Sequence, residues 1–429
     1  MDIRAFRGWR YRMSDDRDVS TLIAPPYDVV SAGCKRALLA GCERNIVAVD
    51  LPHVPPEQAG PDRAYARAAE TLDQWKAGGL LVQDERPCVY LYQQTYTWAG
   101  KTHTRRAIIC GLRVTESGRD VIPHEHTFDG PKADRLKLTE HTRMQLSPIF
   151  AFYRDPRGQV ADLLARPAEA APSAHGRLDG VDQSIWAVSE PDVIASIAEV
   201  LRDSPIYIAD GHHRYTTAVN YADALRESGQ IDADHEANFV MFALVAQDDP
   251  GLLVLPTHRI VRDLESDFTL GALMDRAAAF HWRPCEPAEV DLADADAFLR
   301  PHGAGAMAVI GPRAKESWIA RLKDASAMVA AAPDQCEPWR RLDVAALHRL
   351  ILAEALAPWR RGELSIDYTP DGAEVLAACA DGRAQLGLCL QRTPLAAVVD
   401  VADAGAVMPH KSTYFYPKLA TGMVLKPLE

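Results

Sequence analysis

One stretch restricts the fold more than any other part of the chain, because an apolar segment runs straight into a glycine turn and then into an amphipathic pattern. Pro205–Ala209 has the composition of a short buried strand, and Asp210 and Gly211 follow it directly. Glycine accepts backbone conformations that a tight turn requires. Beyond the turn, apolar residues recur at helical spacing at Tyr215, Ala218, Val219, Ala222 and Leu225. The chain is therefore expected to contain a strand–turn–helix unit typical of α/β proteins.

The rest of the chain supplies both kinds of element, which favours a mixed α/β (α+β) fold. Residues 89–96 and 106–114 are rich in aromatic and β-branched residues and flank a turn at 99–101, so they are expected to form a hairpin. Gln159–Gly180 is rich in Ala, Pro and Gly and is expected to be a surface insertion. Other expected elements are helices over 63–76, from 129 towards 144 and over 342–356, and strands over 238–246 and 252–259.

The length of 429 residues predicts two or three folding units. We expect a core domain over residues 1–265, which contains the two histidine-rich motifs described below. An accessory α/β region is expected over 266–405. The remaining residues, 406–429, are expected to form a C-terminal tail that packs back on the core.

Composition limits the range of partners. The formal net charge is −12, which argues against nucleic acid or an anionic membrane, because both require a basic face. No apolar run approaches the ~20 residues of a membrane helix, and Met1–Phe6 lacks the apolar core of a signal peptide, so a cytoplasmic location is expected. None of the eight cysteines forms a Cys-x-x-Cys pair, and buried free thiols are expected.

The segment from Asp210 to Arg214 has unusual electrostatics for the start of a helix. His212, His213 and Arg214 fall in the first turn, where cations oppose the helix dipole. A bound phosphate or carboxylate, held by the turn at Gly211 and neutralised by Arg214 and a histidine, would explain this placement. Asp210 is expected to cap the helix. The alternative is structural: one histidine bonds a neighbouring carbonyl, and Arg214 pairs with a carboxylate.

A second polar cluster is His124-Glu125-His126-Thr127. A carboxylate between two imidazoles can serve as a general base or contribute to a metal site. The alternative is a solvated turn before a helix that Asp129 caps. The charged residues that follow, Lys132, Asp134 and Arg135, are expected to form surface pairs.

Two weaker segments complete the set of candidate ligands. His258 and Arg259 end an apolar strand, a position that often lines sites in α/β folds. Lys411-Ser412-Thr413 is similar to the end of a phosphate loop but lacks its glycines, so it fails as a Walker motif. Lys411 is still a candidate ligand for an anion.

Six motifs together resemble, in order and over nearly the whole chain, the family called domain of unknown function 1015. They are Pro25-Pro26-Tyr27-Asp28-Val29, His124-Glu125-x-Thr127, Leu146-Ser147-Pro148-Ile149-Phe150, Ile208 to Tyr215, Leu255 to Arg259, and Lys411 to Lys418. The chain is identified as a member of that family. This membership by itself implies no activity.

The Asp-Gly-His-His-Arg turn is also similar to that of the free-serine kinases built on the ParB/sulfiredoxin-like fold. This resemblance implies a ParB/sulfiredoxin-like core with insertions and a C-terminal accessory layer. It implies Glu125 as the base on a serine hydroxyl, with Asp210 orienting the site or its metal and His212 among the catalytic residues. Phosphate or substrate binding is assigned to His124, Thr127, Gly211, His213 and Arg214, with His258, Arg259 and Lys411 as further candidates.

The resulting hypothesis is an enzyme that transfers phosphate to a small hydroxy amino acid such as L-serine, or the reverse reaction on phosphoserine. Positioning, charge neutralisation and Mg²⁺ supply most of the rate in such reactions, with ATP, ADP or pyrophosphate as donor. Two rivals remain open. One is a metal-dependent phosphohydrolase that uses His124, His126, His212 and His213, and the other is a non-catalytic protein that binds a nucleotide or phosphorylated metabolite.

Overall fold

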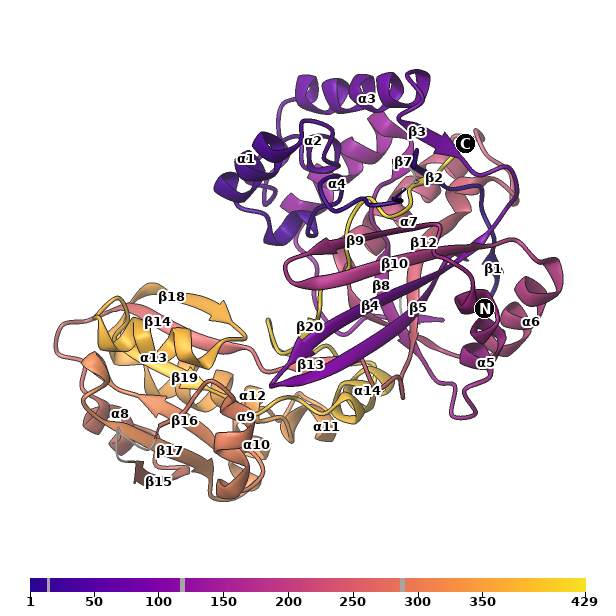
Figure 1. The fold of residues 1–429 in the computed structure, drawn as a ribbon. Helices are drawn as coiled ribbons and strands as arrows, with labels where there is room; N and C mark the ends of the chain where they lie inside the picture. Colours follow the sequence, from indigo (N-terminus) through magenta and orange to yellow (C-terminus); the bar gives the residue numbers. More distant parts are fainter. Residues whose placement is uncertain (14–15, 116–119, 286–289) are drawn as a thin grey trace. The chain divides into compact units, whose positions relative to one another are not determined.

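The computed structural model describes residues 1–13, 16–115, 120–285 and 290–429, and these residues divide into two compact units (Figure 1). The first unit comprises Met1–Leu253 and Pro417–Glu429, and the second comprises Val254–Tyr416. The units divide at 253/254 and 416/417, whereas the sequence placed the boundaries at 265/266 and 405/406. Each unit has its own sheet and its own helices, so the chain is a mixed α/β protein.

The first unit is built on a large mixed sheet. Its described strands follow the order β6-β11-β8-β12-β5-β4-β10-β9, and β1 also pairs with β5. Only the β6–β11 and β8–β12 pairs of this sheet are parallel among the described residues. The bounds are β1 Ile3–Arg4, β4 Val89–Trp98, β5 Lys101–Arg113, β6 Val121–Ile122, β8 Ile149–Tyr153, β9 Ala174–Leu178, β10 Val181–Val188, β11 Ile206–Asp210 and β12 Phe239–Ala246.

The expected hairpin is confirmed as the long β4–β5 ribbon, which is paired from Tyr90 and Ile109 out to Trp98 and Lys101 (Figure 1). Ala99 and Gly100 both have positive φ, as a tight two-residue turn requires. The aromatic and β-branched residues of this ribbon are mostly buried, which is why the composition of the segment predicted its structure.

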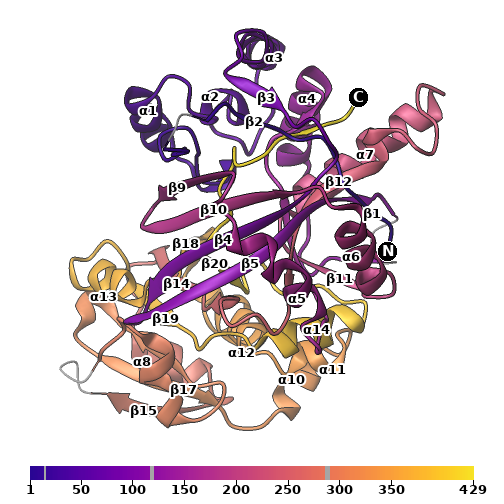
Figure 2. The same cartoon turned by 45° about the vertical axis from the view of Figure 1, so that its right-hand side comes forward.

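The helices of the first unit are labelled in Figure 2. They are α1 Ala32–Gly41, α2 Val47–Asp50, α3 Asp62–Ala77, α4 Asp129–Thr142, α5 Gln159–Ala165, α6 Pro191–Leu201 and α7 His212–Glu227. Alternate residues of the strands, such as Ile206 and Ile208 of β11, join one core with buried residues of α5, α6 and α7. Short pairs of strands complete the unit: β2 Trp9–Tyr11 with β3 Leu81–Gln83, and β7 Met144–Gln145 with β21 Lys426–Pro427.

The expected strand–turn–helix unit is confirmed as β11, Gly211 and α7. The expected cap is wrong, because Gly211 occupies the N-cap position with φ 99° and no side chain caps the helix. Asp210 still belongs to the strand, and its carboxylate bonds elsewhere. The cap expected at Asp129 is wrong as well, since Phe128 is the N-cap of α4.

Gln159–Gly180 is not a surface insertion. Val160 and Leu164 of α5 are buried in the core of the first unit, and β9 is an edge strand paired along β10. The stretch is rich in Ala, Pro and Gly, so its few buried apolar residues form no clear helix or strand pattern in the sequence.

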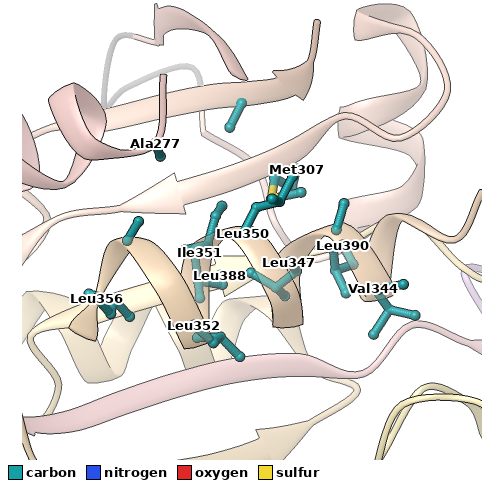
Figure 3. Packing of buried hydrophobic residues seen from close by; sticks show 14 of the residues in the cluster. Ala277, Met307, Val344, Leu347, Leu350, Ile351, Leu352, Leu356, Leu388 and Leu390 are labelled. Carbon is teal, nitrogen blue, oxygen red and sulfur yellow. The ribbon is translucent and has the colours of Figure 1, made fainter. Parts of the chain in front are cut away.

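The second unit contains an antiparallel sheet in the order β15-β17-β16-β19-β14-β18. Its strands alternate between two cores, as the two-residue period of a strand requires. Val261, Val309 and Leu388 lie in one core, and Ile260, Ala308 and Cys389 lie in the other. Figure 3 shows part of the first core, with Leu388 labelled. The strands are β14 His258–Leu264, β15 Phe280–Cys285, β16 Met307–Ile310, β17 Ser317–Leu322, β18 Arg360–Thr369 and β19 Leu386–Cys389; β13 Leu253–Leu255 pairs separately with β20 Tyr414–Tyr416.

The helices of the second unit include the one expected over 342–356, which forms α12 and then a π-helical segment, Leu347–Ala355. This segment supplies Leu347, Leu350 and Ile351 to the core in Figure 3. The others are α8 Leu270–Arg276, α9 Ala295–Leu299, α10 Ser326–Ala331, α11 Glu337–Arg340, α12 Asp343–Ala346, α13 Gly372–Ala380 and α14 Leu395–Asp403.

All eight cysteines are free thiols. Cys88, Cys110, Cys379 and Cys389 are buried as expected, whereas the other four are only partly buried. Across the described ranges, no helix combines the length and the apolar character needed to cross a membrane.

Candidate functional site

The N-terminus of α7 lies at the centre of the candidate site. Gly211 adopts a left-handed conformation there, and a Cβ at this position would lie 3.0 Å from the guanidinium carbon of Arg214. A side chain at this position would press on the Arg214 guanidinium and would also be strained by the positive φ, so glycine is favoured here. Because no side chain caps the helix, its first turn presents backbone N–H groups and the positive end of the dipole.

Asp210 is held by a cation from the far end of the sequence. The Lys418 ammonium lies 2.7 Å from one carboxylate oxygen of Asp210, and an Arg214 nitrogen lies 3.9 Å from the other. Burial acts to raise the pKa of Asp210, but Lys418 and Arg214 outweigh it and hold that pKa well below its usual value. Asp210 is therefore ionised throughout the physiological range and pairs with both cations, which leaves these three groups with a net positive charge.

His124 and His212 form a buried pair. The His124 backbone N–H donates to Nε2 of His212 at 3.2 Å, Nδ1 of His124 donates to the Ile208 carbonyl oxygen at 2.6 Å, and the two rings meet edge to face with centroids 4.7 Å apart. Nε2 of His212 must be unprotonated to accept this bond. Burial lowers the pKa of both histidines. Both are neutral near pH 7.

This neutrality changes the electrostatic argument from the sequence. His212 does not bring a positive charge to the start of α7, and Asp210 compensates one of the two positive charges of Arg214 and Lys418. The expected conflict with the helix dipole is thus relieved in part by the protein itself. What remains is a polar turn with a net positive charge, in which two cations and one carboxylate lie beside uncapped N–H groups.

Glu125 lies in the loop between β6 and α4, directly after His124. Its side chain is half-buried, and no described residue forms a hydrogen bond or ion pair with its carboxylate. Thr127 is half-buried in the same loop, and His126 is exposed. The carboxylate of Glu125 is therefore available to a ligand.

His213 anchors the end of this loop. Its Nε2 accepts a hydrogen bond of 2.9 Å from the backbone N–H of Phe128, and its ring stacks on the Phe128 ring with centroids 5.9 Å apart. Phe128 is 52% exposed, which is unusual for a large apolar side chain. The contacts of His124 and His213 together fix the Glu125 loop against the first turn of α7.

The histidines do not form a metal-binding site in the described part of the chain. No described group of three or more His, Cys, Asp or Glu residues has the geometry to hold a metal ion. His126 is exposed, and Nε2 of both His212 and His213 accepts a backbone hydrogen bond. The four-histidine ligand set of the phosphohydrolase alternative is therefore not assembled in the described residues. Asp210 is also a poor metal ligand while it binds Lys418.

Arg214 fastens α7 to the segment before β8. It donates to the Pro148 carbonyl oxygen and to the Ser147 hydroxyl, the latter at 3.3 Å. Its Nε is buried and has no hydrogen-bond partner among the described residues. Buried donors are normally satisfied, so this group is a candidate for binding a ligand.

Asp134 and Arg135 were expected on the surface, and that expectation is wrong. Arg135 donates to Asp134 at 2.8 Å and to the Asp50 backbone oxygen at 2.7 Å, and both charged side chains of α4 are almost fully buried. The Tyr65 hydroxyl donates to Asp134 at 2.6 Å, and the Tyr27 ring lies 4.0 Å below the Arg135 guanidinium. This network connects the Pro25–Val29 motif to α4.

His258, Arg259 and Lys411 belong to the second unit. Arg259 is fully buried and donates to Nε2 of His348 at 2.9 Å and to the Lys411 backbone oxygen at 3.0 Å. Burial lowers the pKa of Arg259 to about 10 and that of His258 to about 4. Lys411 is exposed. The carbonyl contacts give Arg259 a role in holding the 410–411 turn.

Lys418 is the site residue that sequence reasoning missed. Its motif was identified, but Lys411 was chosen because Lys-Ser-Thr is similar to a phosphate loop. The useful signal was that the motif ends in a second lysine after a proline. Only the fold brings that lysine to Asp210.

The chain belongs to the family described as "Protein of unknown function (DUF1015)", whose model matches residues 3–345. The match includes both histidine motifs and ends within α12. No curated protein matches the chain significantly.

Three solved structures are similar to the chain at low identity. A free serine kinase in complex with AMP has 11% identity and a TM-score of 0.33, covering 74% of this chain and 92% of the kinase. SbnI with a C-terminal truncation from Staphylococcus aureus has 11% identity and a TM-score of 0.36, covering 75% and 87%. A conserved hypothetical protein from Pyrococcus furiosus has 13% identity and a TM-score of 0.34, covering 75% and 95%. Likenesses at these TM-scores do not establish a shared fold or activity.

Proposed function

We propose that the chain is a phosphotransferase that acts on a small hydroxy amino acid such as L-serine, or on its phosphate ester in reverse. The observation that carries the proposal is the first turn of α7. Uncapped N–H groups lie beside the Asp210–Lys418 pair and Arg214 there, and the unpartnered Glu125 carboxylate lies in the adjoining loop. Phosphoryl transfer requires positioned donors for phosphate oxygens and one base for the hydroxyl.

In this proposal the N-terminus of α7 binds the transferred phosphoryl group, with Gly211 allowing close approach of the backbone. Arg214 and Lys418 provide positive charge, and Asp210 holds both in place. The neutral pair His124 and His212 keeps the loop in position without adding charge. Thr127 and His213 lie on the side of the proposed phosphate site that adjoins the Glu125 loop.

Glu125 accepts the proton of the substrate hydroxyl in the forward direction. The hydroxyl oxygen then bonds to phosphorus as the bond from phosphorus to the donor's bridging oxygen breaks, and the donor leaves one phosphate shorter. A carboxylate fits this role because it is free of protein partners and adjoins the proposed phosphate site.

A nucleotide (ATP or ADP) or pyrophosphate is the proposed donor. Because the described residues contain no cage for a metal, we propose that Mg²⁺ arrives with the donor phosphates, as it commonly does, and neutralises their charge. The likeness of the Asp-Gly-His-His-Arg turn to free-serine kinases supports serine as the first acceptor to test, and a ParB/sulfiredoxin-like core is part of the same proposal.

Phosphorus NMR on the full chain with Mg²⁺ tests this function. ATP, ADP and pyrophosphate are each supplied with L-serine, and phosphoserine is supplied alone and with AMP or ADP. The proposal predicts a new phosphomonoester resonance with one donor, or loss of phosphoserine dependent on a nucleotide. Donor or phosphoserine binding without any turnover in all mixtures would instead support the non-catalytic alternative.

A further inference from the structure

A cavity of about 490 Å³ lies in the first unit between α5 and the large sheet. Its lining includes Val160 and Leu164 of α5, Ile108 of β5 and Leu244 of β12. All four residues belong to the hydrophobic core, so this part of the lining is apolar. Sites for small organic ligands commonly enclose about 300–1,000 Å³ and combine apolar walls with a few polar groups. The cavity is therefore large enough for a ligand of this kind.

The cavity is separate from the candidate site. Tyr153, which lines it, is the last residue of β8, whereas Phe150 near the start of the same strand pairs with Asp210. Three residues of a strand span about 10 Å, so the two sites lie toward opposite ends of β8. The described lining contains none of the residues assigned to the phosphate site.

The hydroxyl of Tyr153 is the first group in the cavity that calls for a ligand. Tyr153 is only 3% exposed, and its hydroxyl forms no hydrogen bond with a described residue. Burial raises the pKa of this hydroxyl, and the nearby charges of Asp155 and Asp249 raise it further, so it stays protonated. Buried tyrosine hydroxyls normally have a hydrogen-bond partner. A ligand in the cavity would supply one.

Carboxylates make up much of the polar lining. Asp155 is almost fully buried and accepts two backbone N–H groups at the start of α5, at 2.9 and 3.1 Å. Asp249 accepts two other backbone N–H groups, at 2.8 and 3.2 Å. An ionised carboxylate offers about four acceptor positions, so each of these side chains can accept further hydrogen bonds from a ligand.

The charges of the lining favour a cation. The described lining contains three carboxylates, those of Asp155, Asp248 and Asp249, and one cation, Arg106. Burial raises the pKa of Asp249 and outweighs its hydrogen bonds and the nearby charges of Arg105 and Arg106. The protein's own cations therefore do not make up for the lost solvent. A bound cation would compensate the excess of negative charge, whereas an anion would increase it.

We propose that this cavity binds an amphipathic organic ammonium ion, with its N–H groups on the Tyr153 hydroxyl oxygen and on the carboxylates of Asp155 and Asp249. A primary ammonium group has three donors, which match these three acceptors. The apolar body of the ligand packs against Val160 and Leu164. This site is additional to the proposed phosphate site and does not depend on phosphoryl transfer.

Ligand-observed NMR titrations of the full chain test the class of ligand. The probes are phenethylamine, 2-phenylethanol and phenylacetate, which share an aromatic body and carry a positive, zero and negative charge. Phenethylamine is expected to bind at least ten-fold more tightly than the other two. Equal affinities for the three probes, or no binding of phenethylamine at millimolar concentration, would overturn the proposal.

Tyr153→Phe tests the role of the hydroxyl. It is expected to weaken phenethylamine binding at least five-fold. Because the hydroxyl has no partner among the described residues, the same change should leave the free energy of unfolding nearly unchanged. The control is Tyr11→Phe, which removes a hydroxyl that donates to the Arg44 carbonyl oxygen at 2.9 Å. This control should lower stability and leave phenethylamine affinity unchanged.

Ala161→Phe tests the location, because Ala161 is an exposed residue of α5 that lines the cavity. The larger side chain is expected to weaken phenethylamine binding at least ten-fold. Ala165→Phe, at an exposed position of the same helix outside the described lining, is the control and should have no effect. Wild-type affinity in a folded Tyr153→Phe or Ala161→Phe protein would overturn the assignment, and if one variant does not fold, the other decides.

Discussion

The ammonium group of Lys418 lies 2.7 Å from the carboxylate of Asp210, although the two residues are 208 positions apart in the chain. Both side chains are mostly buried, and Arg214 is the only other cation near this carboxylate in the described residues. The contact ties the last segment of the chain to the strand that precedes α7. It also determines the charge at the candidate phosphate site.

Lys418→Met is expected to destabilise the first unit, because it leaves Asp210 ionised and mostly buried with only the more distant Arg214 as a partner. Removing one member of a buried ion pair costs about 3–5 kcal/mol, and Arg214 reduces the expected loss to about 2–3 kcal/mol. Urea unfolding at pH 7.5 measures this loss of stability. Lys132→Met, which breaks an ion pair with the fully exposed Asp129, is the control and should cost clearly less. Equal losses would contradict the role given to Lys418.

His212 is expected to make stability depend on pH below neutrality. Burial lowers its folded pKa, so the unfolded chain takes up a proton near pH 6.5 while the folded chain does not. Stability therefore falls as the pH falls below about 6.5. Between pH 7.5 and 5.5, the wild type should lose about 1 kcal/mol more than His212→Gln, whose side-chain oxygen can still accept the His124 N–H. The exposed His126→Gln is the control, and a His212→Gln protein with the wild-type loss would refute the assignment.

Arg135→Leu is expected to cost about 3–5 kcal/mol, because it leaves Asp50 and Asp134 buried without their cation. Guanidinium unfolding, followed by tryptophan fluorescence, measures the loss. Arg143→Leu removes the same type of side chain from an exposed pair with Glu429 and should cost much less. A small loss of stability in Arg135→Leu would contradict this prediction, because it would show that Asp50 and Asp134 can stay buried without their cation.

The sequence predicted the local parts of this structure well. The β4–β5 hairpin, β11 and α7 each have a periodicity or turn signal within about twenty residues. The two histidine motifs were identified as one site, and His124 does contact His212.

The parts that sequence reasoning missed depend on contacts between distant segments. Asp134 and Arg135 were placed on the surface because charged side chains usually lie there. Their burial requires Asp50 from α2 and Tyr65 from α3, which no local pattern reveals. Lys418 was missed for the same reason. The sequence also led us to expect a charged His212 that opposes the dipole of α7. That expectation is wrong, because burial keeps His212 neutral.

The most direct test of the central claim compares turnover and binding in Glu125→Gln. Gln keeps the size and polarity of the side chain but cannot accept the hydroxyl proton. If Glu125 is the base, phosphoryl transfer should fall by about 10²–10⁴-fold while the dissociation constants of donor and amino acid stay within two-fold of the wild type. Turnover at the wild-type rate in the folded Glu125→Gln protein would contradict the account.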